Sequence, residues 1–169
     1  FVGLNFFDTL LIRNKYQFKG APPFSPGGEF SGRLAALGAG VEGFRVGERV
    51  AGSMTFGAAR SHLAVPASSI VKVPDAVSDE AAAGVFVTYG TTLHALRQRG
   101  ELKPGETLAV LGASGGVGVA AVEVGAVMGA RVIACASSPD KLDFCKRHGA
   151  DVGIDYSTQD LKEALKRET

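Results

Sequence analysis

The chain has 169 residues, of which 46% are hydrophobic and 21% are charged, and its formal net charge is +1. This composition is typical of a soluble globular protein, and a charge so close to zero gives no electrostatic reason to expect a nucleic-acid or membrane surface. The sequence contains no apolar run long enough for a transmembrane helix and no recognisable signal peptide at its start.

The first residue and the two cysteines bear on the cellular context. Because the chain begins at Phe1 in a strongly hydrophobic run, we expect it to be a fragment with sequence missing before this residue. Cys135 and Cys145 lie in apolar segments, which favours reduced thiols over a disulfide framework and therefore the cytoplasm. A transit peptide lost with the missing segment would instead indicate the mitochondrion.

Residues 1–77 have the pattern of a small β domain. Up to about Val73, short apolar runs alternate with segments rich in glycine and proline, such as APPFSPGGEFSG and LGAGVEGFRVGERVAG. This close spacing of turn signals is typical of antiparallel strands in a barrel or a sandwich. We therefore expect a first domain that is built mainly from β-structure.

From Ser78 onward, helical and strand-like segments alternate. Ser78 is a candidate N-cap for a helix that continues to Gly100. The elements that follow are expected to be strands at 107–112, 131–136 and 150–156 and helices at 115–129, 139–148 and 157–169, the last capped by Ser157 or Thr158. Strand 107–112 is apolar enough for burial on both faces. The alternation predicts βαβ units and a parallel sheet over residues 78–169.

A glycine-rich loop joins the first of these strands to its helix. Residues 112–118 match a dinucleotide-binding fingerprint of the form A-x-G-x-x-G, with Ala113 in the first glycine position. The second position lets the backbone approach a pyrophosphate, the third lets helix and strand pack closely, and the helix N-terminus attracts phosphate. The expected nucleotide-binding residues of this loop are Gly115, Gly116, Val117 and Gly118. A glycine-rich turn without a nucleotide is the alternative.

The end of the second parallel strand indicates which nucleotide is bound. NAD sites place an Asp or Glu at this strand tip to bind the ribose 2′-hydroxyl, whereas NADP sites supply a hydroxyl or a cation. Ser137 follows the strand here and Lys141 lies close behind it, so both are candidates for binding a 2′-phosphate. The sequence therefore favours NADPH. Asp140 keeps NAD as the alternative, and Lys141 could equally be a solvated helix residue.

Several motifs occur in the order seen in one enzyme family. The segments VGLNFFDTLLIRNKY, PGGEFSG, GVEGFRVGERV, GASGGVG, ARVIACASSPDK and GADVGIDY together resemble the zinc-free quinone oxidoreductases, which include zeta-crystallin, of the medium-chain dehydrogenase/reductase superfamily. The resemblance covers essentially the whole chain. It implies an α/β fold in which a partial GroES-like β-barrel catalytic domain (residues 1–77) precedes the first half of a doubly wound Rossmann domain (residues 78–169). It also implies that NADPH binds in the cleft between the two domains.

The resemblance assigns roles to single residues. Asn5 is similar to an asparagine that approaches the nicotinamide, and Tyr16 to a tyrosine that lines the substrate cleft, so these two are the candidate catalytic residues. Thr91 is similar to a residue near the nicotinamide ribose, and Tyr156 to a tyrosine beside the adenosine. The two strand-tip residues match the family's 2′-phosphate site. On the sequence pattern alone, Tyr16 could be a partly buried loop residue and Tyr156 could simply end a strand.

Two positions depart from the patterns of the family. Leu10 stands where some relatives carry a second cleft tyrosine, which leaves the substrate open. Gly28 stands where zinc-dependent members carry the histidine of a Gly-His-Glu motif, and no cysteine precedes it. The three histidines of the chain are scattered along it: His62, His94 and His148. Since catalytic zinc needs three protein ligands, we expect no metal site.

The function implied by the resemblance is hydride transfer from NADPH to a quinone or a related electron-poor acceptor without a metal, with the cofactor supplying the chemistry. An enoyl or enone reductase is the first alternative, since enoyl-reductase domains of polyketide synthases share GLNF, the Gly-Gly-Glu segment and the glycine-rich loop. A non-enzymatic crystallin or RNA-binding relative is the second, although the near-zero charge argues against RNA. The usual assembly of the family is a homodimer.

The family fold also implies an incomplete sheet. Only the first half of the usual doubly wound strand order is expected here, so strand 107–112, central in the whole sheet, becomes an exposed apolar edge. The first domain likewise lacks its opening strands. We therefore expect the isolated segment to fold poorly or to aggregate.

Overall fold

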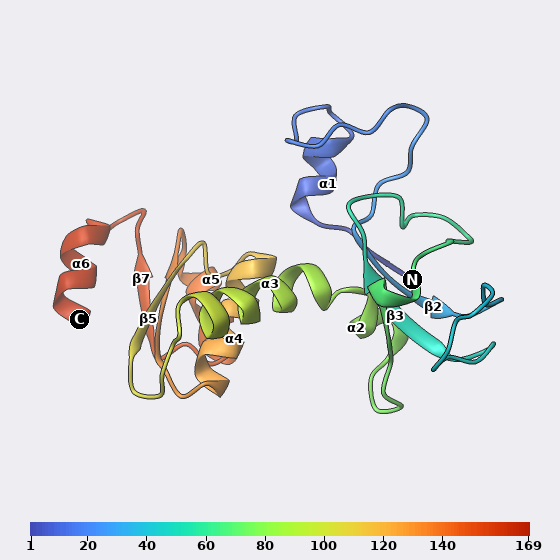
Figure 1. The fold of residues 1–169 in the computed structure, drawn as a ribbon. Coiled ribbons are helices and arrows are strands. Elements are labelled where there is room, and N and C mark those ends of the chain that lie inside the picture. The colour runs from blue at the N-terminus through green and yellow to red at the C-terminus, as the bar shows by residue number, and fades with distance from the viewer. The chain divides into compact units, whose positions relative to one another are not determined.

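The computed structural model describes residues 1–169, which divide into two compact units, Phe1–Val87 and Thr88–Thr169 (Figure 1). The first unit is built around an antiparallel sheet and the second around a parallel sheet, as the sequence predicted. The sequence placed the domain boundary at residue 78, whereas the first compact unit continues to Val87, because the short helix after Ser78 packs on the antiparallel sheet. Neither unit has a helix with the length and hydrophobicity of a membrane span.

Four short strands form the sheet of the first unit. They pair in chain order, each antiparallel to its neighbour: β1 (Val2–Gly3), β2 (Glu29–Arg33), β3 (Arg49–Ser53) and β4 (Ile70–Lys72). The other elements of the unit are α1 (Phe6–Leu11), the 3₁₀ turn η1 (Ala67–Ser69) and α2 (Asp79–Ala83). Ser78 caps α2 as predicted, because its Oγ accepts the N–H of Ala81 at 3.1 Å.

The two faces of this sheet pack against different parts of the unit. On one face, Phe30, Val50 and Ile70 belong to one hydrophobic core. On the other face, Ala51 packs with Ala82 of α2 in a second, smaller core. Val50 and Ala51 face opposite ways because successive side chains of a strand alternate between its faces. The alternation along β3 therefore fixes α2 on the side of the sheet away from the larger core.

The single helix expected over residues 78–100 is interrupted. α2 ends with Gly84 as its C-cap. The segment then continues as two wide, π-helical turns on either side of a short α-helix: η2 (Phe86–Gly90), α3 (Thr91–Leu93) and η3 (His94–Arg99). Glycine and the β-branched and aromatic residues that follow it have low helix propensity, which explains why the regular helix breaks at this point.

The second unit contains a three-stranded parallel sheet with the order β5-β6-β7. Its strands are β5 (Thr107–Leu111), β6 (Arg131–Ala136) and β7 (Val152–Asp155). Its helices are α4 (Gly116–Val127), α5 (Pro139–Arg147) and α6 (Leu161–Glu168). All six elements lie within the predicted ranges, so the prediction of βαβ units is confirmed.

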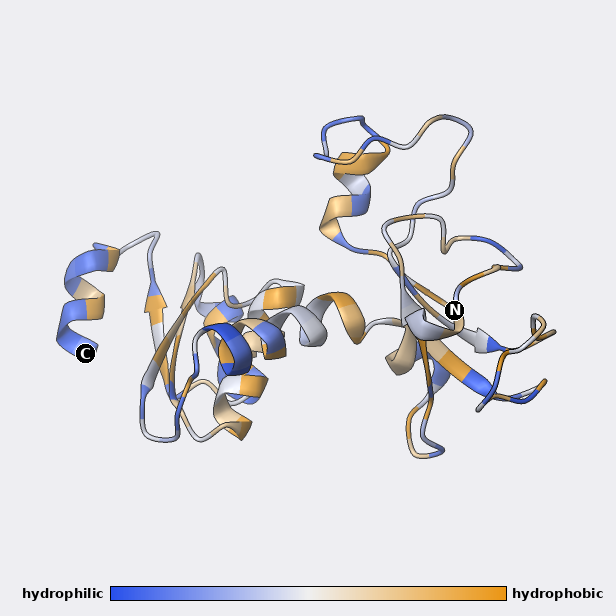
Figure 2. Ribbon diagram, viewed as in Figure 1, coloured by the Kyte–Doolittle hydropathy of each residue, from blue (hydrophilic) through white to orange (hydrophobic).

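Helices cover both faces of β6. Val132 and Ala134 belong to a core that α4 and α5 complete, and this core includes Cys145. Ile133 and Cys135 face the opposite side and pack with α6. Figure 2 shows apolar residues along the strands of this sheet and polar residues over much of α6. The sheet therefore has one helical layer on each side.

β5 is buried on one face only. Val110 is 7% exposed but Leu111 is 63% exposed, so a strand whose residues suit burial on both faces has one face uncovered here. The reason is its position: β5 is an edge strand, as expected for a half sheet, and α6 packs over β6 and β7 instead.

The N-cap of α6 also differs from the expected one. Asp160 accepts the N–H of Glu163 at 2.9 Å and so caps the helix in place of Ser157 or Thr158. Ser157 belongs to the preceding turn, where its N–H and its Oγ donate to Asp155 Oδ1 at 2.9 and 2.6 Å. The helix therefore starts later than predicted because this turn uses the polar residues that could have capped it.

Cys135 and Cys145 are both free and buried, on opposite faces of the parallel sheet. Burial raises the pKa of each thiol. A raised pKa reduces the thiolate fraction, which is the reactive form of cysteine. Both residues therefore serve as small apolar side chains of the core.

Candidate functional site

The glycine-rich loop turns the chain from the end of β5 into α4. Ala113 is fully buried, and its N–H donates to the carbonyl of Cys135 at 3.1 Å, which sets the loop beside the end of β6. Gly112 has a φ of +63°, a left-handed conformation that favours glycine, and its carbonyl accepts the N–H of Gly115 at 2.9 Å. The loop is therefore a tight turn that leads directly into the first turn of α4.

Gly115 and Gly118 are surrounded differently. A Cβ on Gly118 would lie 2.3 Å from the carbonyl oxygen of Gly112, so no side chain fits between helix and loop. A Cβ on Gly115 would meet nothing closer than 3.4 Å, so packing within the unit does not require glycine there. Gly115 is the N-cap of α4, whose first N–H groups have no acceptor within the helix. Open space at such a helix N-terminus suits a phosphate group.

Three residues predicted for the adenosine end of the nucleotide come together at the carboxyl edge of the parallel sheet. Lys141 Nζ donates to Ser137 Oγ at 2.8 Å, and Lys141 is exposed. The N–H of Tyr156 donates to the carbonyl of Ala136 at 3.1 Å, which places Tyr156 beside the residue next to Ser137. Asp140 is exposed in the first turn of α5.

Thr91 lies at the start of α3 and is exposed. The next residue, Thr92, is buried, and its Oγ1 lies 3.5 Å from the carbonyl oxygen of Val117. Sequence reasoning did not single out Thr92, although a buried hydroxyl in a helix usually needs a nearby acceptor. Of the two neighbouring threonines, the structure therefore brings Thr92 to the glycine-rich loop, while the role of Thr91 stays a prediction.

Asn5 precedes α1 in the first unit, and a buried aspartate holds its backbone. The N–H of Asn5 donates to Asp8 Oδ2 at 2.8 Å, and its carbonyl accepts the N–H of Asp8 at 3.0 Å. Asp8 is 4% exposed, and its Oδ1 accepts the N–H of Gly27 at 2.8 Å. One carboxylate therefore ties the start of α1 to the loop before β2.

The side chain of Asn5 is held by a second buried carboxylate. Glu29 is 1% exposed, and its Oε1 accepts from Asn5 Nδ2 at 2.7 Å. Its Oε2 accepts the N–H groups of Phe86 and Val87 at 2.8 and 2.9 Å. Sequence reasoning missed this role of Glu29. The available signal was an acidic residue placed between two glycines and an apolar strand. A glutamate in such a segment is rarely buried unless it has hydrogen-bond or ionic partners, so its position could have indicated a structural role.

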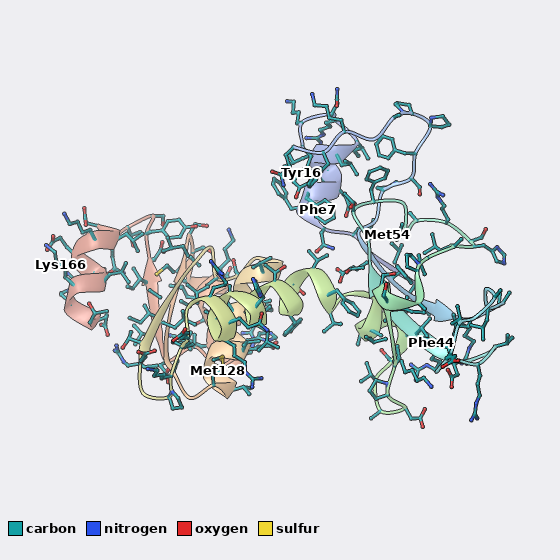
Figure 3. All side chains as sticks on the ribbon, in the orientation of Figure 1. Phe7, Tyr16, Phe44, Met54, Met128 and Lys166 are labelled. Atoms are coloured by element: carbon teal, nitrogen blue, oxygen red, sulfur yellow. The ribbon has the colours of Figure 1, made fainter.

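Tyr16 belongs to a small aromatic group beside α1. Figure 3 shows Tyr16 and Phe7 close to each other beside α1. The ring centroid of Tyr16 lies 5.4 Å from that of Phe7 and 6.1 Å from that of Phe18. The ring of Phe7 also covers Gly28, where an added Cβ would lie 2.4 Å from Phe7 Cζ. Phe7 therefore supports Tyr16 and fills the space that a side chain at position 28 would need.

The histidines lie in separate contacts, and no three His, Cys, Asp or Glu side chains come together as metal ligands. His94 Nδ1 lies 2.6 Å from Gln98 Oε1 on the same helical segment. His148 Nδ1 lies 2.6 Å from Glu123 Oε1, and the other oxygen of Glu123 accepts from the hydroxyl of Tyr89. These two hydrogen bonds, the tyrosine's first, hold the pKa of Glu123 below its ordinary value.

A cavity of about 900 Å³ in the first unit lies apart from Asn5 and Tyr16. Its walls include Phe30, Val50 and Ile70, which form the larger hydrophobic core of that unit. None of the predicted site residues lines it. The cavity is therefore an uncovered part of the core, and the candidate site is defined by the polar contacts described above.

Two family models match the chain. One, described as an alcohol dehydrogenase GroES-like domain, matches residues 1–75, and the other, described as a zinc-binding dehydrogenase, matches residues 116–169. The chain is 38% identical over 168 residues to quinone oxidoreductase-like protein 2 of Rattus norvegicus. The aligned region covers 99% of this chain and 48% of that protein. The chain thus spans about half the length of the curated relatives it matches.

Solved structures agree with these matches. Escherichia coli quinone oxidoreductase complexed with NADPH has a TM-score of 0.92 at 32% identity, covering 99% of this chain and 51% of that one. The CurK enoyl reductase has a TM-score of 0.85 at 30% identity, covering 99% and 53%. Given both family models in this order and these relatives, the chain belongs to the medium-chain dehydrogenase/reductase family, where it is similar to the quinone oxidoreductases.

Proposed function

We propose that the full-length protein is an NADPH-dependent oxidoreductase that reduces quinones or related electron-poor acceptors. One observation carries the proposal: Lys141 and Ser137 converge at the tip of β6, beside a glycine-rich helix N-terminus. A cation and a hydroxyl there suit a 2′-phosphate, whereas an NAD site would place an acid at this strand tip. The similar quinone oxidoreductase of Escherichia coli is complexed with NADPH, which supports the choice of nucleotide.

Each part of the nucleotide has a proposed partner in the second unit. The loop residues 115–118 would hold the pyrophosphate, because the N-terminus of α4 provides N–H donors and a partial positive charge. Tyr156 is exposed enough to lie against the adenosine, and Thr91 is proposed for the nicotinamide ribose. The chemistry of these residues therefore supports the proposed nucleotide.

Asn5 and Tyr16 are proposed to orient the reacting groups. When bound, NADPH supplies a hydride for an electron-poor acceptor. Asn5 is held by hydrogen bonds to Asp8 and Glu29, and the ring of Tyr16 packs against that of Phe7 at an interplanar angle of 36°. Such fixed side chains serve positioning, which lowers the entropic part of a reaction barrier. We assign neither residue a proton-transfer step.

The site is proposed to work without a metal. In zinc-dependent members of the family, the position of Gly28 carries a histidine, whereas the ring of Phe7 takes up that space here. The family model described as a zinc-binding dehydrogenase matches only residues 116–169, away from Gly28. Catalytic zinc needs three protein ligands, and the residues around Gly28 do not fit such a site.

Nucleotide titration of the full-length protein tests the proposal. Wild type should bind NADPH more tightly than NADH, and Lys141→Ala should weaken NADPH binding by about tenfold or more, because a charge-assisted contact to phosphate is lost. NADH binding should stay unchanged. Lys146→Ala is the matched control, since Lys146 is exposed on the same helix and lies 3.8 Å from Asp143.

Equal binding of NADPH and NADH by wild type would contradict the assignment. It would mean that Asp140 or another group binds the ribose, and the strand tip would then be an NAD site. Binding of neither nucleotide would refute the oxidoreductase proposal while leaving the family fold intact.

An enoyl or enone reductase is the second candidate. It is favoured by the similarity to the CurK enoyl reductase. Leu10, which stands where some relatives carry a second cleft tyrosine, does not exclude it. The two candidates share the nucleotide site and differ in the acceptor. Comparing kcat/KM for a benzoquinone with kcat/KM for an enoyl thioester under the same NADPH concentration distinguishes them.

A further inference from the structure

Glu29 is the most completely enclosed charged side chain of the first unit. A Cβ on Gly3 would lie 2.6 Å from both Glu29 Cγ and Glu29 Oε1, so the glycine of β1 provides the space through which the glutamate passes. Its carboxylate then receives three N–H donors: one from Asn5 Nδ2 and two from the backbone of Phe86 and Val87. Val87 is the last residue of the first unit.

The contact with Glu29 determines which way the amide of Asn5 faces. A carboxylate offers acceptors only, so the group of Asn5 that lies 2.7 Å from it must be the NH₂. The amide oxygen of Asn5 is then directed away from Glu29. The side chain of Asn5 also accepts the N–H of Asp8 in a capping box at the start of α1. An amide oxygen has two lone pairs, and Asn5 is only half buried, so its second lone pair is the one that a ligand donor would use.

We propose that Glu29 is a positioning residue that makes Asn5 an acceptor for an N–H donor of the ligand, and that the same carboxylate holds the backbone at Phe86 and Val87. This inference rests on the proposed function, in which the ligand's donor would be the carboxamide NH₂ of the nicotinamide. One buried side chain thereby sets the polarity of Asn5 and fixes the segment through which the chain leaves the first unit.

Substitution of Glu29 by glutamine should reverse the polarity of Asn5. The N–H groups of Phe86 and Val87 are fixed by the backbone, so the glutamine oxygen must stay with them. The glutamine NH₂ then faces Asn5, whose amide has to rotate and offers its own NH₂ to the ligand. The NH₂ of Asn5 would then face the carboxamide NH₂ of the nicotinamide, and because both groups are donors, this hydrogen bond would be lost.

Substitution of Asn5 by aspartate tests the same contact from the other side. In the Asn5→Asp variant, two carboxylates face each other across a contact that is 2.7 Å long in the wild type, which is repulsive. In Glu29→Gln/Asn5→Asp, the glutamine NH₂ again has an acceptor to donate to. The second aspartate oxygen then presents an acceptor to the ligand, as the amide oxygen does in the wild type.

The experiment is a double-mutant cycle in the full-length protein. We expect each single substitution to weaken NADPH binding about tenfold or more, and the double variant to return to within about threefold of the wild type. Glu42→Gln, at an exposed position of the same unit, is the matched control and should change nothing. If Glu29 acted only by holding the backbone of Phe86 and Val87, Glu29→Gln would not restore the binding lost in Asn5→Asp.

Hydrogen exchange provides a readout that does not depend on the nucleotide. Glu29→Ala removes the acceptor of the Phe86 and Val87 amides and should speed their exchange, whereas Glu29→Gln should leave it slow. The melting temperature should fall in Asn5→Asp and recover when Glu29→Gln is added.

Additive losses of NADPH affinity in the double variant, or slow amide exchange in Glu29→Ala, would overturn the inference. If the wild type binds no NADPH, the proposed function fails, and the melting temperatures and amide exchange of the same variants still decide whether Glu29 positions Asn5. Recovery of the melting temperature would then support the positioning role, and no recovery would refute it.

Discussion

The two units hold their candidate site residues by different physical means. In the first unit, the buried carboxylates of Asp8 and Glu29 accept N–H donors from segments that are far apart in the sequence. In the second unit, the shape of the backbone positions the site, through a tight turn at Gly112 and close contact at Gly118. Polar contacts and close packing have different costs when they are broken, so the two regions should respond differently to substitution.

The largest effect is expected in the second unit, at Gly118. Gly118→Ala would place a Cβ 2.3 Å from a backbone oxygen, which cannot move aside as a flexible side chain can. We expect the free energy of unfolding of the full-length protein to fall by about 3 kcal/mol, measured by denaturant titration.

Gly115→Ala is the matched control for this experiment. Its Cβ would meet nothing closer than 3.4 Å, so we expect the free energy of unfolding to stay within about 1 kcal/mol of the wild type. NADPH binding should weaken, because the methyl group occupies the space proposed for the pyrophosphate. Similar stability of the two variants would contradict the view that close packing shapes this loop.

A smaller effect is expected in the first unit, at Asp8. Asp8→Ala leaves the N–H groups of Asn5 and Gly27 without their acceptor in a buried place, which should lower the free energy of unfolding by about 2 kcal/mol. Asp75→Ala, at an exposed position of the same unit, is the control. Denaturant titration gives the energies, and faster amide exchange at Gly27 would locate the change.

An unchanged amide exchange rate at Gly27 in Asp8→Ala would contradict this account. Asp8→Asn sharpens it further, because an asparagine keeps one acceptor oxygen for two donors. Its loss of stability should therefore lie between those of the wild type and Asp8→Ala.

The difference between the units also explains what the sequence could predict. The parallel sheet and the glycine-rich loop follow from patterns within short segments, because strand, turn and helix signals are local. Ser137 and Lys141 are only four residues apart, where β6 leads into α5, so their contact could be predicted from this short segment alone. The nucleotide side of the site could therefore be predicted almost residue by residue, although its binding roles remain proposals.

The first unit could be predicted only as a fold class. Glu29 meets Phe86 across 57 residues of sequence, and no local pattern connects the two. The sequence predicted β5 as an exposed edge, but it could not predict that Leu111 is exposed while Val110 is buried, because this depends on which face of the strand a helix covers. Contacts between distant segments decide both cases, and such contacts are set by packing of the whole unit.

Glu123 shows how a carboxylate behaves in the second unit, where it is only partly buried. It accepts from the hydroxyl of Tyr89 and lies 2.6 Å from His148 Nδ1. These contacts hold its pKa below the ordinary value of 4.5. A group whose pKa is lower in the folded state stabilises that state above the unfolded pKa, and this contribution is lost as the pH falls through the folded pKa.

The smallest effect is therefore expected at Glu123, because water screens a carboxylate that is about a third exposed. Glu123→Gln should lower the melting temperature of the full-length protein at about pH 6, and the difference from the wild type should shrink at about pH 3.5. Glu163→Gln, which alters an exposed ion pair on α6, is the control. A difference that stays constant between the two pH values would mean that Glu123 acts through its shape. In that case only the buried carboxylates, those of Asp8 and Glu29, would position other groups through their charge.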